Sequence, residues 1–399
     1  MTIKVFKNEK AKELLTIGIT SLLLVSLLLI RTEKLDYNHA LFSQNWDHHK
    51  YIAMAEGNPF DFHIAPFCWR IGVPVLAKAL PWDLQDSFTV ISFISIWMTG
   101  VLIYYLSRIF KFSQIYAFVG MLMFFSMKYA TRIYLFIFWG ADPLSSLFIV
   151  LSICCILLKR DILFLIVVMI GVTVKESVIF AAPLYYTFNA RKIIDGKLAI
   201  RMLLLVAPAV FVLISLRIGI PKMNDDAKYL STLPETLRIV QEGTSSYNYL
   251  ALLRDIGLQR VKTLSLLTLG DYTVGTFGIA LMSLPFFSVR RNIELFLRFI
   301  PFLVLVGSQL LFAVGTNRLL ALGFPAIIMM ALNGIDTVSK ALFIRQKYFI
   351  ILALLIFGLN LISMNPFSSV SQQILLIEAF AFIMFLAFFC SLKYDIINK

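Results

Sequence analysis

The side chains that could do chemistry are concentrated in one segment near the N-terminus. All four histidines of the chain lie there, at His39, His48, His49 and His63, and Asp47 lies beside two of them. A positioned carboxylate can take the proton from an attacking hydroxyl group. Asp47 heads a predicted short helix, so it is a candidate general base. Its alternative role is to cap that helix.

The histidines raise the question of a metal site. His48 and His49 are adjacent, so on a helix they point in different directions and do not form the i, i+4 pair of a zinc helix. A metal would need His63 or His39 to fold back onto them. The alternative is that these histidines contact lipid head groups or substrate. We therefore assign no metal ligand and no required cofactor, although the His-Asp cluster permits a divalent metal.

Four more charged residues lie within or beside apolar segments, where a charge is costly and usually functional. Lys175 and Glu176 interrupt one apolar stretch, Asp142 opens another, and Arg318 precedes a third. The planar guanidinium of an isolated arginine suits a phosphate group. Each residue also has a structural interpretation. These are a salt bridge at a helix break for Lys175 and Glu176, an N-cap for Asp142, and an interfacial anchor for Arg318.

The composition indicates which class of protein must position these residues. Of 399 residues, 59% are hydrophobic and 15% are charged. A soluble chain is nearer half apolar and a quarter charged, so the composition excludes a soluble enzyme, a disordered chain and a disulfide scaffold. The net charge of +13 fits the cytoplasmic loops of a membrane protein, and we expect no nucleic-acid partner.

The hydrophobic pattern predicts an all-α polytopic membrane protein, a single domain over residues 1–399. About twelve transmembrane or partial-span helices are expected, at residues 14–30, 88–107, 114–127, 142–158, 162–174, 177–189, 198–218, 264–287, 296–314, 318–334, 348–364 and 374–392. Several are shorter than the roughly 20 residues of a full crossing. We expect two short helices to meet at Lys175 and Glu176, because broken helices occur where they line a polar cavity or pack inside protein.

The distribution of basic residues predicts the orientation. With the N-terminus in the cytoplasm, the cytoplasmic segments hold 20 of the 36 Lys and Arg residues, whereas the short outer connections hold only Lys128, Arg132, Lys175 and Arg318. The positive-inside rule then places both termini in the cytoplasm. The two long loops, 31–87 and 219–263, face outward. We expect a multi-pass protein of the plasma (inner) membrane, with its active site on the outer face.

The first outer loop is predicted to carry two juxtamembrane helices. The segment NWDHHKYIAMAEG forms the first, and PFCWRIGVPVLAKALP forms the second, which is amphipathic. In the second, Arg70 and Lys78 are expected to extend toward the head groups while Trp69 and Val75 lie in the membrane interface. The loop as a whole is therefore expected to lie on the outer membrane surface.

This layout resembles the membrane-embedded glycosyltransferases of the GT-C superfamily, which use polyprenyl-phosphate-linked sugars. The segment NWDHHKYIAMAEG is similar to the W/Y-D-x-x-x-Y-x-x-x-A segment of several mannosyltransferase-like members. The segment APFCWRIGVPVLAKALP is similar to the P-x-x-x-R-x-L-x-P-x-L-A run that often follows it. Later segments of those chains resemble ADPLSSLFIVLSI, VTVKESVIFAAPLYY and NRLLALGFPAIIMMA. The resemblance covers roughly residues 14–335.

The resemblance implies an inverting glycosyltransferase of cell-envelope glycan biosynthesis, acting on a glycan, lipid or protein acceptor among membrane lipids. It makes Asp47 the base that activates the acceptor hydroxyl. Lys175 and Arg318 would hold the donor phosphate, and Glu176 would orient Lys175. The other candidates for binding substrate are His48, His49, Asp142 and Arg70. The chain departs from the family where His48 follows Asp47 in place of a second aspartate, and where Leu319 replaces an aromatic residue.

Two other classes of protein fit the composition. A transporter or flippase for a lipid-linked glycan would place its charges near the bilayer midplane and often shows an inverted repeat. A polysaccharide polymerase or ligase would depend on the 219–263 loop. A GT-C glycosyltransferase would depend on Asp47.

Overall fold

The structure is a computed structural model that describes residues 2–35, 47–190, 192, 194–222, 253–263, 265–312 and 316–397. Over these residues the secondary structure is helical, without strands. The elements are α1 Thr2–Ile30, α2 Asp47–Glu56, η2 Pro59–Asp61, η3 Phe67–Trp69, α3 Gly72–Ala79, α4 Leu84–Ile109, α5 Gln114–Ser126, α6 Arg132–Phe136, α7 Asp142–Leu157, α8 Asp161–Val174, η4 Glu176–Ala181, α9 Ala182–Asn189, α10 Gly196–Gly219, η6 Leu253–Gly257, α13 Leu258–Thr263, α14 Leu266–Phe277, α15 Ile279–Ser283, η7 Leu284–Ser288, α16 Val289–Ser308, η8 Gln309–Leu311, α17 Thr316–Ala321, α18 Phe324–Ala341, α19 Gln346–Asn360 and α20 Ser369–Ile397.

Five stretches in the described part of the chain are long and apolar enough to cross a membrane. They are Ala11–Ile30, Leu84–Ile109, Gly196–Gly219, Ile279–Leu311 and Gln373–Ser391. Four shorter apolar helices accompany them, namely α5, α7, α8 and α19. The chain is therefore an all-helical protein with several candidate membrane spans, and the count of twelve remains a prediction.

Local sequence signals explain where several helices begin. Asp83 caps α4 by accepting a hydrogen bond from the Asp86 amide at 2.8 Å. Ser113 caps α5 in the same way, and Asp195 caps α10. Such caps satisfy amide groups that have no partner within the helix.

The predicted span at 264–287 is wrong. The structure divides it into α14, α15 and η7, with the first break at Gly278. This residue has φ of +78°, a conformation that side-chain-bearing residues rarely adopt, so the helix direction changes there. The apolar pattern is continuous across the break, which is why the sequence suggested one helix.

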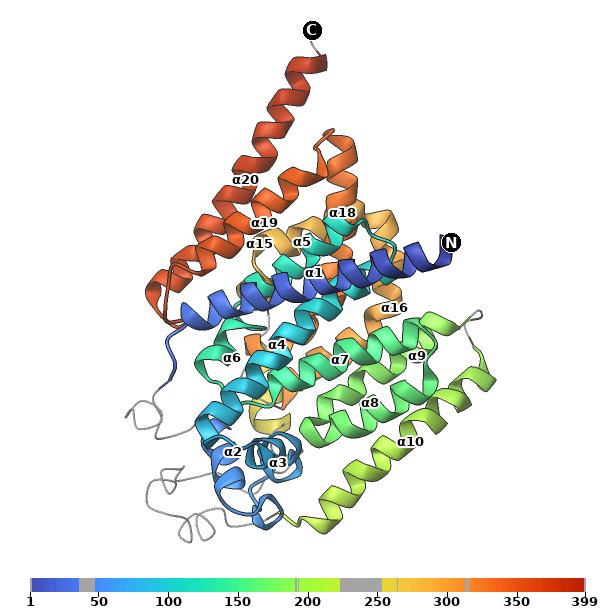
Figure 1. Ribbon diagram of the computed structural model, residues 1–399, viewed down its shortest axis with the longest axis vertical. Helices are drawn as coiled ribbons and strands as arrows, with labels where there is room; N and C mark the ends of the chain where they lie inside the picture. The colour runs from blue at the N-terminus through green and yellow to red at the C-terminus, as the bar shows by residue number, and fades with distance from the viewer. Residues whose placement is uncertain are drawn as a thin grey trace.

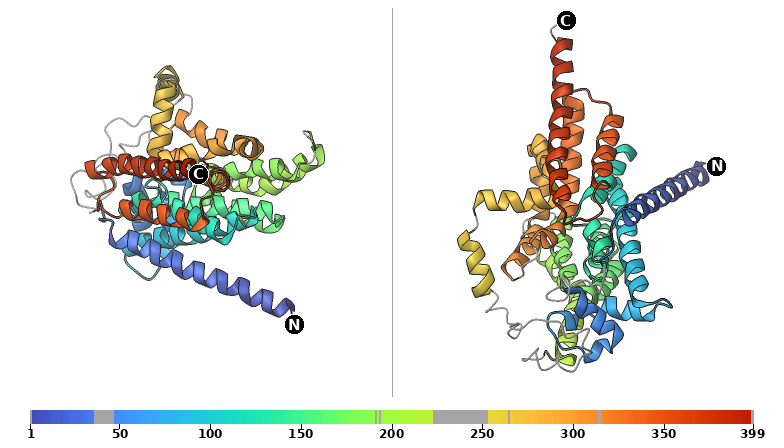
Figure 2. Two further views of the ribbon diagram at one scale, coloured as in Figure 1. Left: turned by 90° about the horizontal axis from the view of Figure 1, so that it is seen from above. Right: turned by 90° about the vertical axis from the view of Figure 1, so that its left-hand side faces the viewer.

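The bundle is built around α4, α5, α7 and α18. Helix α4 packs against α5 and α7, α7 packs against α8, and α8 packs against α10 (Figure 1). Phe124, Phe125 and Phe324 are almost completely buried at the centre. The N-terminal part of α1 and the C-terminal part of α20 project away from this core (Figure 2). Large apolar side chains such as Phe211 and Phe380 are exposed on the outer helices, as expected for a surface that meets lipid.

A buried arginine joins the ends of three helices. Arg132, on α6, is only 1% exposed. Its guanidinium donates hydrogen bonds to the carbonyl oxygens of Asn360 and Ser363 and to the Thr32 hydroxyl, the last at 3.4 Å. It therefore links the C-terminal ends of α1 and α19 to α6.

The juxtamembrane elements η3 and α3 are held against the bundle. The Trp69 indole donates a hydrogen bond to the Ile220 carbonyl, at the end of α10, at 3.1 Å. The Lys78 ammonium donates to the Gly57 carbonyl, just after α2. Figure 1 shows α2 and α3 side by side at the lower end of the molecule, near the start of α4. The described residues 47–83 of the first loop are thus packed against one end of the helices.

Candidate functional site: a buried charge cluster beneath the first loop

A buried ion pair joins α7 to the break after α8. The Lys175 ammonium donates to Oδ1 of Asp142, and their side chains are 5% and 7% exposed. Lys175 lies in extended conformation between α8 and η4, which confirms the predicted helix break at this position. The predicted N-cap role of Asp142 is wrong, because Ala141 occupies the N-cap position of α7 and Asp142 is the first helical residue. Its carboxylate binds the lysine instead.

Arg318 brings a second cation to the same carboxylate. It lies on α17, and its Nε atom is 3.7 Å from Oδ2 of Asp142. Its side chain is 33% exposed, far more than those of the buried pair. Asp142 therefore lies between a buried ammonium and a partly exposed guanidinium that are distant in the sequence.

A second ion pair lies beside the first. Arg70, which follows η3, forms a two-pronged contact with Glu176, in which Nε lies 2.9 Å from Oε2 and Nη2 donates to Oε1. The Arg70 side chain is 12% exposed. The prediction that Arg70 extends toward the head groups is therefore wrong, because its guanidinium turns inward to a carboxylate. Glu176 binds Arg70, so the carboxylate that orients Lys175 is Asp142.

The Arg70–Glu176 pair shifts the acidity of both groups, which lie outside the membrane-spanning helices. Burial by itself would raise the pKa of the Glu176 carboxyl. The positive charge and hydrogen bonds of Arg70 outweigh burial and lower that pKa to about 2. Burial would lower the pKa of Arg70, whereas Glu176 and a hydrogen bond with Tyr51 raise it well above its ordinary value. Both groups therefore stay charged near neutral pH.

Helix α2 contacts the cluster through Tyr51, which interacts with Arg70, and packs on Phe67 through Tyr51 and Lys50. The Tyr51 ring meets Phe67 edge-on at 5.6 Å, and the Lys50 ammonium lies 4.5 Å from the centre of the same ring. Tyr51 follows Asp47 by four residues, so the two positions share one face of α2. The helix thus presents the Asp47 position on the same face as a residue that contacts Arg70.

Asp47 and the four histidines differ in how much of each the structure describes. Asp47, His48 and His49 form the first turn of α2, but their side chains lie outside the part of the chain that the structure describes, and His39 lies outside the described residues altogether. His63 is described, and its Nδ1 lies 2.9 Å from the Pro221 carbonyl oxygen. Among the described residues, no group of three His, Cys, Asp or Glu side chains could hold a metal ion.

Helix lengths set the depth of the cluster. Helices α7 and α8 contain 16 and 14 residues. At 1.5 Å per residue they extend about 24 Å and about 21 Å, less than the roughly 30 Å of the hydrocarbon core. If their far ends lie at one membrane surface, Asp142 and Lys175 lie several ångströms below the other. The midplane lies about 15 Å below each surface, so Asp142, at a depth of about 6 Å, is closer to the surface, whereas Lys175, at about 9 Å, is closer to the midplane.

The five charged residues have a net positive charge. Arg70, Lys175 and Arg318 supply three positive charges, and Asp142 and Glu176 supply two negative ones. Such a set of fixed cations in a partly buried site can hold a phosphate and stabilise negative charge that develops on it. Arg318 has the largest exposed fraction of these side chains, so it is the cation best placed to meet an anion from outside.

Comparisons with known proteins add no assignment. No protein-family model matches the chain, and no curated protein matches its sequence. The case for function therefore depends on the sequence pattern and on the charge cluster.

Proposed function

We propose that this chain is a membrane glycosyltransferase of the GT-C type. It would move a sugar from a polyprenyl-phosphate donor to a hydroxyl group of a glycan, lipid or protein acceptor at the outer membrane face. The observation that carries this proposal is the convergence of Arg70, Asp142, Lys175, Glu176 and Arg318 beneath the loop that contains Asp47. Those residues come from four separate segments of the sequence.

The proposed reaction is a direct displacement at the anomeric carbon. Asp47 takes the proton of the acceptor hydroxyl, and the acceptor oxygen forms the new bond to the sugar. The bond between the sugar and the phosphate oxygen breaks, and the lipid phosphate leaves with the electron pair. The configuration at the anomeric carbon is therefore inverted. Arg318 meets the leaving phosphate, while Lys175 adds its positive charge and fixes Asp142 beside Arg318.

The two rival classes would depend on different features of the chain. A transporter is expected to carry its charges near the midplane, and here Asp142 lies nearer one surface, while Lys175 lies nearer the midplane. A polymerase would depend on the 219–263 loop, most of which lies outside the described residues.

Sugar transfer in purified membranes tests the proposal. Radiolabelled polyprenyl-phosphate sugars are supplied with a panel of acceptors to the wild type, to Asp47→Asn and to Asp61→Asn, a matched change in the same loop. We expect Asp47→Asn to abolish transfer and Asp61→Asn to preserve it, since only Asp47 is the base. Arg318→Met is expected to raise the KM for the donor, because it removes the exposed phosphate partner.

Three results would reject the proposal in different ways. Full transfer by Asp47→Asn would show that Asp47 is not the general base. An unchanged KM for the donor in Arg318→Met would show that Arg318 does not bind the donor phosphate. A wild type that transfers no sugar from any donor to any acceptor, but moves lipid-linked glycan across vesicle membranes, would instead assign the transporter class.

A further inference from the structure

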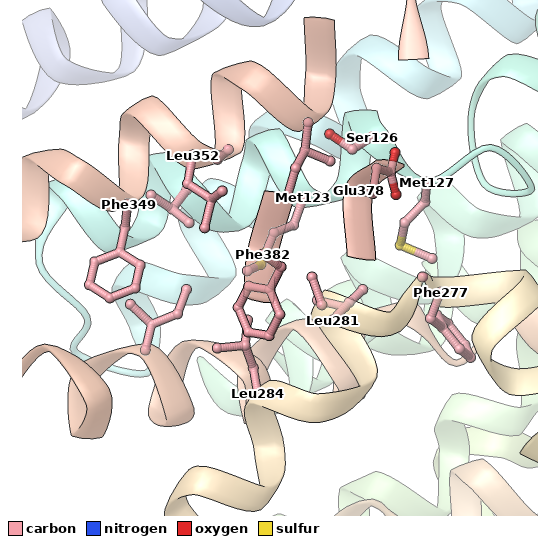
Figure 3. A pocket seen from close by; sticks show the side chains of 16 residues that line it. Met123, Ser126, Met127, Phe277, Leu281, Leu284, Phe349, Leu352, Glu378 and Phe382 are labelled. Carbon is pink, nitrogen blue, oxygen red and sulfur yellow. The ribbon is translucent and has the colours of Figure 1, made fainter. Parts of the chain in front are cut away.

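A cavity lies between α5 and the C-terminal helices, apart from the charge cluster. Its volume is about 60 Å³, and side chains from α5, α14, α15, α19 and α20 line it (Figure 3). Its walls are mostly apolar, with Met123, Met127, Phe277, Phe349 and Phe382 among them.

A single ionisable side chain, Glu378, lies among the residues that line this cavity. It is 8% exposed and projects from α20, an otherwise apolar segment at this point. Its Oε1 atom accepts a hydrogen bond of 2.6 Å from the Asn360 amide. Figure 3 shows the carboxyl group near Ser126 and Met127. Among the described residues, no hydrogen bond reaches Oε2, so this oxygen is available to a ligand.

Gly278 leaves space beside that oxygen. A Cβ atom at Gly278 would lie 3.5 Å from Oε2, in van der Waals contact with it. The backbone at Gly278 also has φ of +78°, so a side chain would be strained there. The turn between α14 and α15 thus keeps one side of the carboxyl group open.

A hydroxyl group matches a buried carboxyl group in either protonation state. It can donate to a carboxylate oxygen and accept from a protonated one, so no charge and no polar atom is left without a partner. An alkyl group in the same position would leave Oε2 without a partner, and an ammonium would fit only the ionised form. The chemistry of the site therefore favours an alcohol.

The size and surroundings of the cavity define the rest of the ligand. A water molecule needs about 10–15 Å³ of such space, so the cavity holds roughly five water-sized groups. That is enough for a hydroxyl group and a few carbon atoms, while a longer chain would continue outside. Phe380 and Ile383, on the outer face of α20, are 65% and 57% exposed, so this helix presents an apolar surface of the kind that meets alkyl chains in a bilayer.

We propose that this cavity binds the hydroxyl end of a long-chain aliphatic alcohol from the surrounding lipid, with the hydroxyl group at Oε2 of Glu378. The site does not depend on the proposed sugar transfer, because it shares no residue with the charge cluster.

Photolabelling of the purified full-length protein in phosphatidylcholine nanodiscs tests the proposal. The probe is a sixteen-carbon alcohol with a diazirine near its hydroxyl group. Two matched probes carry a methyl group or an amine in place of the hydroxyl. We expect the alcohol to label Met123, Met127 or Phe382 about tenfold more than the methyl probe, because one buried hydrogen bond contributes about 1.4 kcal/mol.

Variants separate binding at Glu378 from a general affinity for the apolar surface. Glu378→Leu is expected to make the alcohol and methyl probes label equally. Glu378→Gln keeps the acceptor for Asn360 and offers an amide to the hydroxyl group. The ratio of labelling by the alcohol probe to labelling by the methyl probe should therefore stay within about threefold of the wild-type ratio. Glu294→Gln, at an exposed glutamate on α16, serves as the matched control and should behave as the wild type.

Several outcomes would overturn the proposal. Equal labelling of the wild type by the alcohol and methyl probes would show that the hydroxyl group is not recognised. Stronger labelling by the amine than by the alcohol would identify a cation site instead. If Glu378→Leu does not fold, Glu378→Gln and Leu352→Trp still test the site. The tryptophan at position 352 should fill the cavity and reduce labelling by the alcohol probe at least twofold. Unchanged labelling in Leu352→Trp would place the alcohol elsewhere.

Discussion

The Asp142–Lys175 pair places two opposite charges where neither is well solvated. Removing one partner from such a pair leaves a buried charge uncompensated, whereas replacing both by apolar residues often costs little. The pair has two effects. It joins α7 to the end of α8, and it keeps the positive charge of Lys175 close to Arg318. Substitutions can separate these effects.

We predict that Asp142→Asn destabilises the protein by about 3–5 kcal/mol, because it leaves the Lys175 ammonium without its carboxylate. Lys175→Met should destabilise it by less, because Asp142 keeps Arg318 at 3.7 Å. The double variant Asp142→Leu, Lys175→Met should recover most of this loss but not the sugar transfer. Chemical unfolding in micelles and the transfer assay measure the two effects. An Asp142→Asn variant that remains within about 1 kcal/mol of the wild type would contradict the buried pairing.

Glu176 predicts a pH dependence of stability. Its pKa is about 2 in the folded protein and has an ordinary value of 4.5. Because folding lowers this pKa, the stabilisation is fully present above pH 4.5 and is lost as the pH falls toward 2. The Tm of the wild type should therefore fall more steeply between pH 5 and pH 2.5 than that of Glu176→Gln. Parallel Tm curves for the two proteins would mean that the Arg70–Glu176 contact contributes nothing.

At the scale of elements, the backbones of α18 and η7 lie in close contact. A Cβ atom on Gly334 would lie 1.9 Å from the Leu284 carbonyl oxygen, so any side chain there forces the two elements apart. Gly307, on α16, has no atom within 4 Å of the corresponding position. The two glycines therefore form a matched comparison.

We predict that Gly334→Ala destabilises the protein by about 1–3 kcal/mol, the cost of forcing packed elements to move. Gly307→Ala should be neutral or stabilise by up to about 1 kcal/mol, since alanine favours the helix. Thermal unfolding of both variants in the same detergent provides the measurement. A neutral Gly334→Ala would show that η7 and α18 are less closely packed than described.

Helix positions were largely predictable from the sequence, and contacts between distant residues were not. The break at Lys175 followed from a charged dipeptide inside an apolar stretch, and the structure places it there. The break at Gly278 depends on backbone conformation within a continuous apolar run, so hydrophobic pattern alone could not reveal it. A lone carboxylate in the predicted segment 374–392 did offer a signal for Glu378 that the sequence analysis left unused.

In the candidate site, too, the residues could be predicted from the sequence but their contacts could not. Residue type and position in the apolar pattern selected Asp142, Lys175, Glu176 and Arg318, the family resemblance added Arg70, and all five converge. The sequence could not give their pairing, because Lys175 and Glu176 are neighbours whose partners lie 33 and 106 residues away. Pairing is a property of tertiary structure, and local pattern carries no information about it.

At the scale of the whole molecule, the charge distribution predicts which ends of the bundle face the cytoplasm. We expect a cysteine at Phe60, which is 53% exposed beside α2, to react from outside with a membrane-impermeant maleimide. A cysteine at Lys197, exposed at the start of α10, should react only after the membrane is opened. Both variants are made in a Cys390→Ser background, since Cys390 is also exposed. Labelling in the opposite order would invert the topology and move the charge cluster to the cytoplasmic side.

The arginine that joins α1, α6 and α19 also constrains how the chain is synthesised. The carbonyl oxygens that receive its hydrogen bonds belong to residues 228 and 231 positions later. At about 5–20 residues per second, the ribosome takes roughly 11–46 s to reach them. During that interval the guanidinium of Arg132 must stay at the aqueous boundary of the bilayer. The hydrogen bonds of Arg132 can therefore be completed only after residues 360 and 363 have been synthesised.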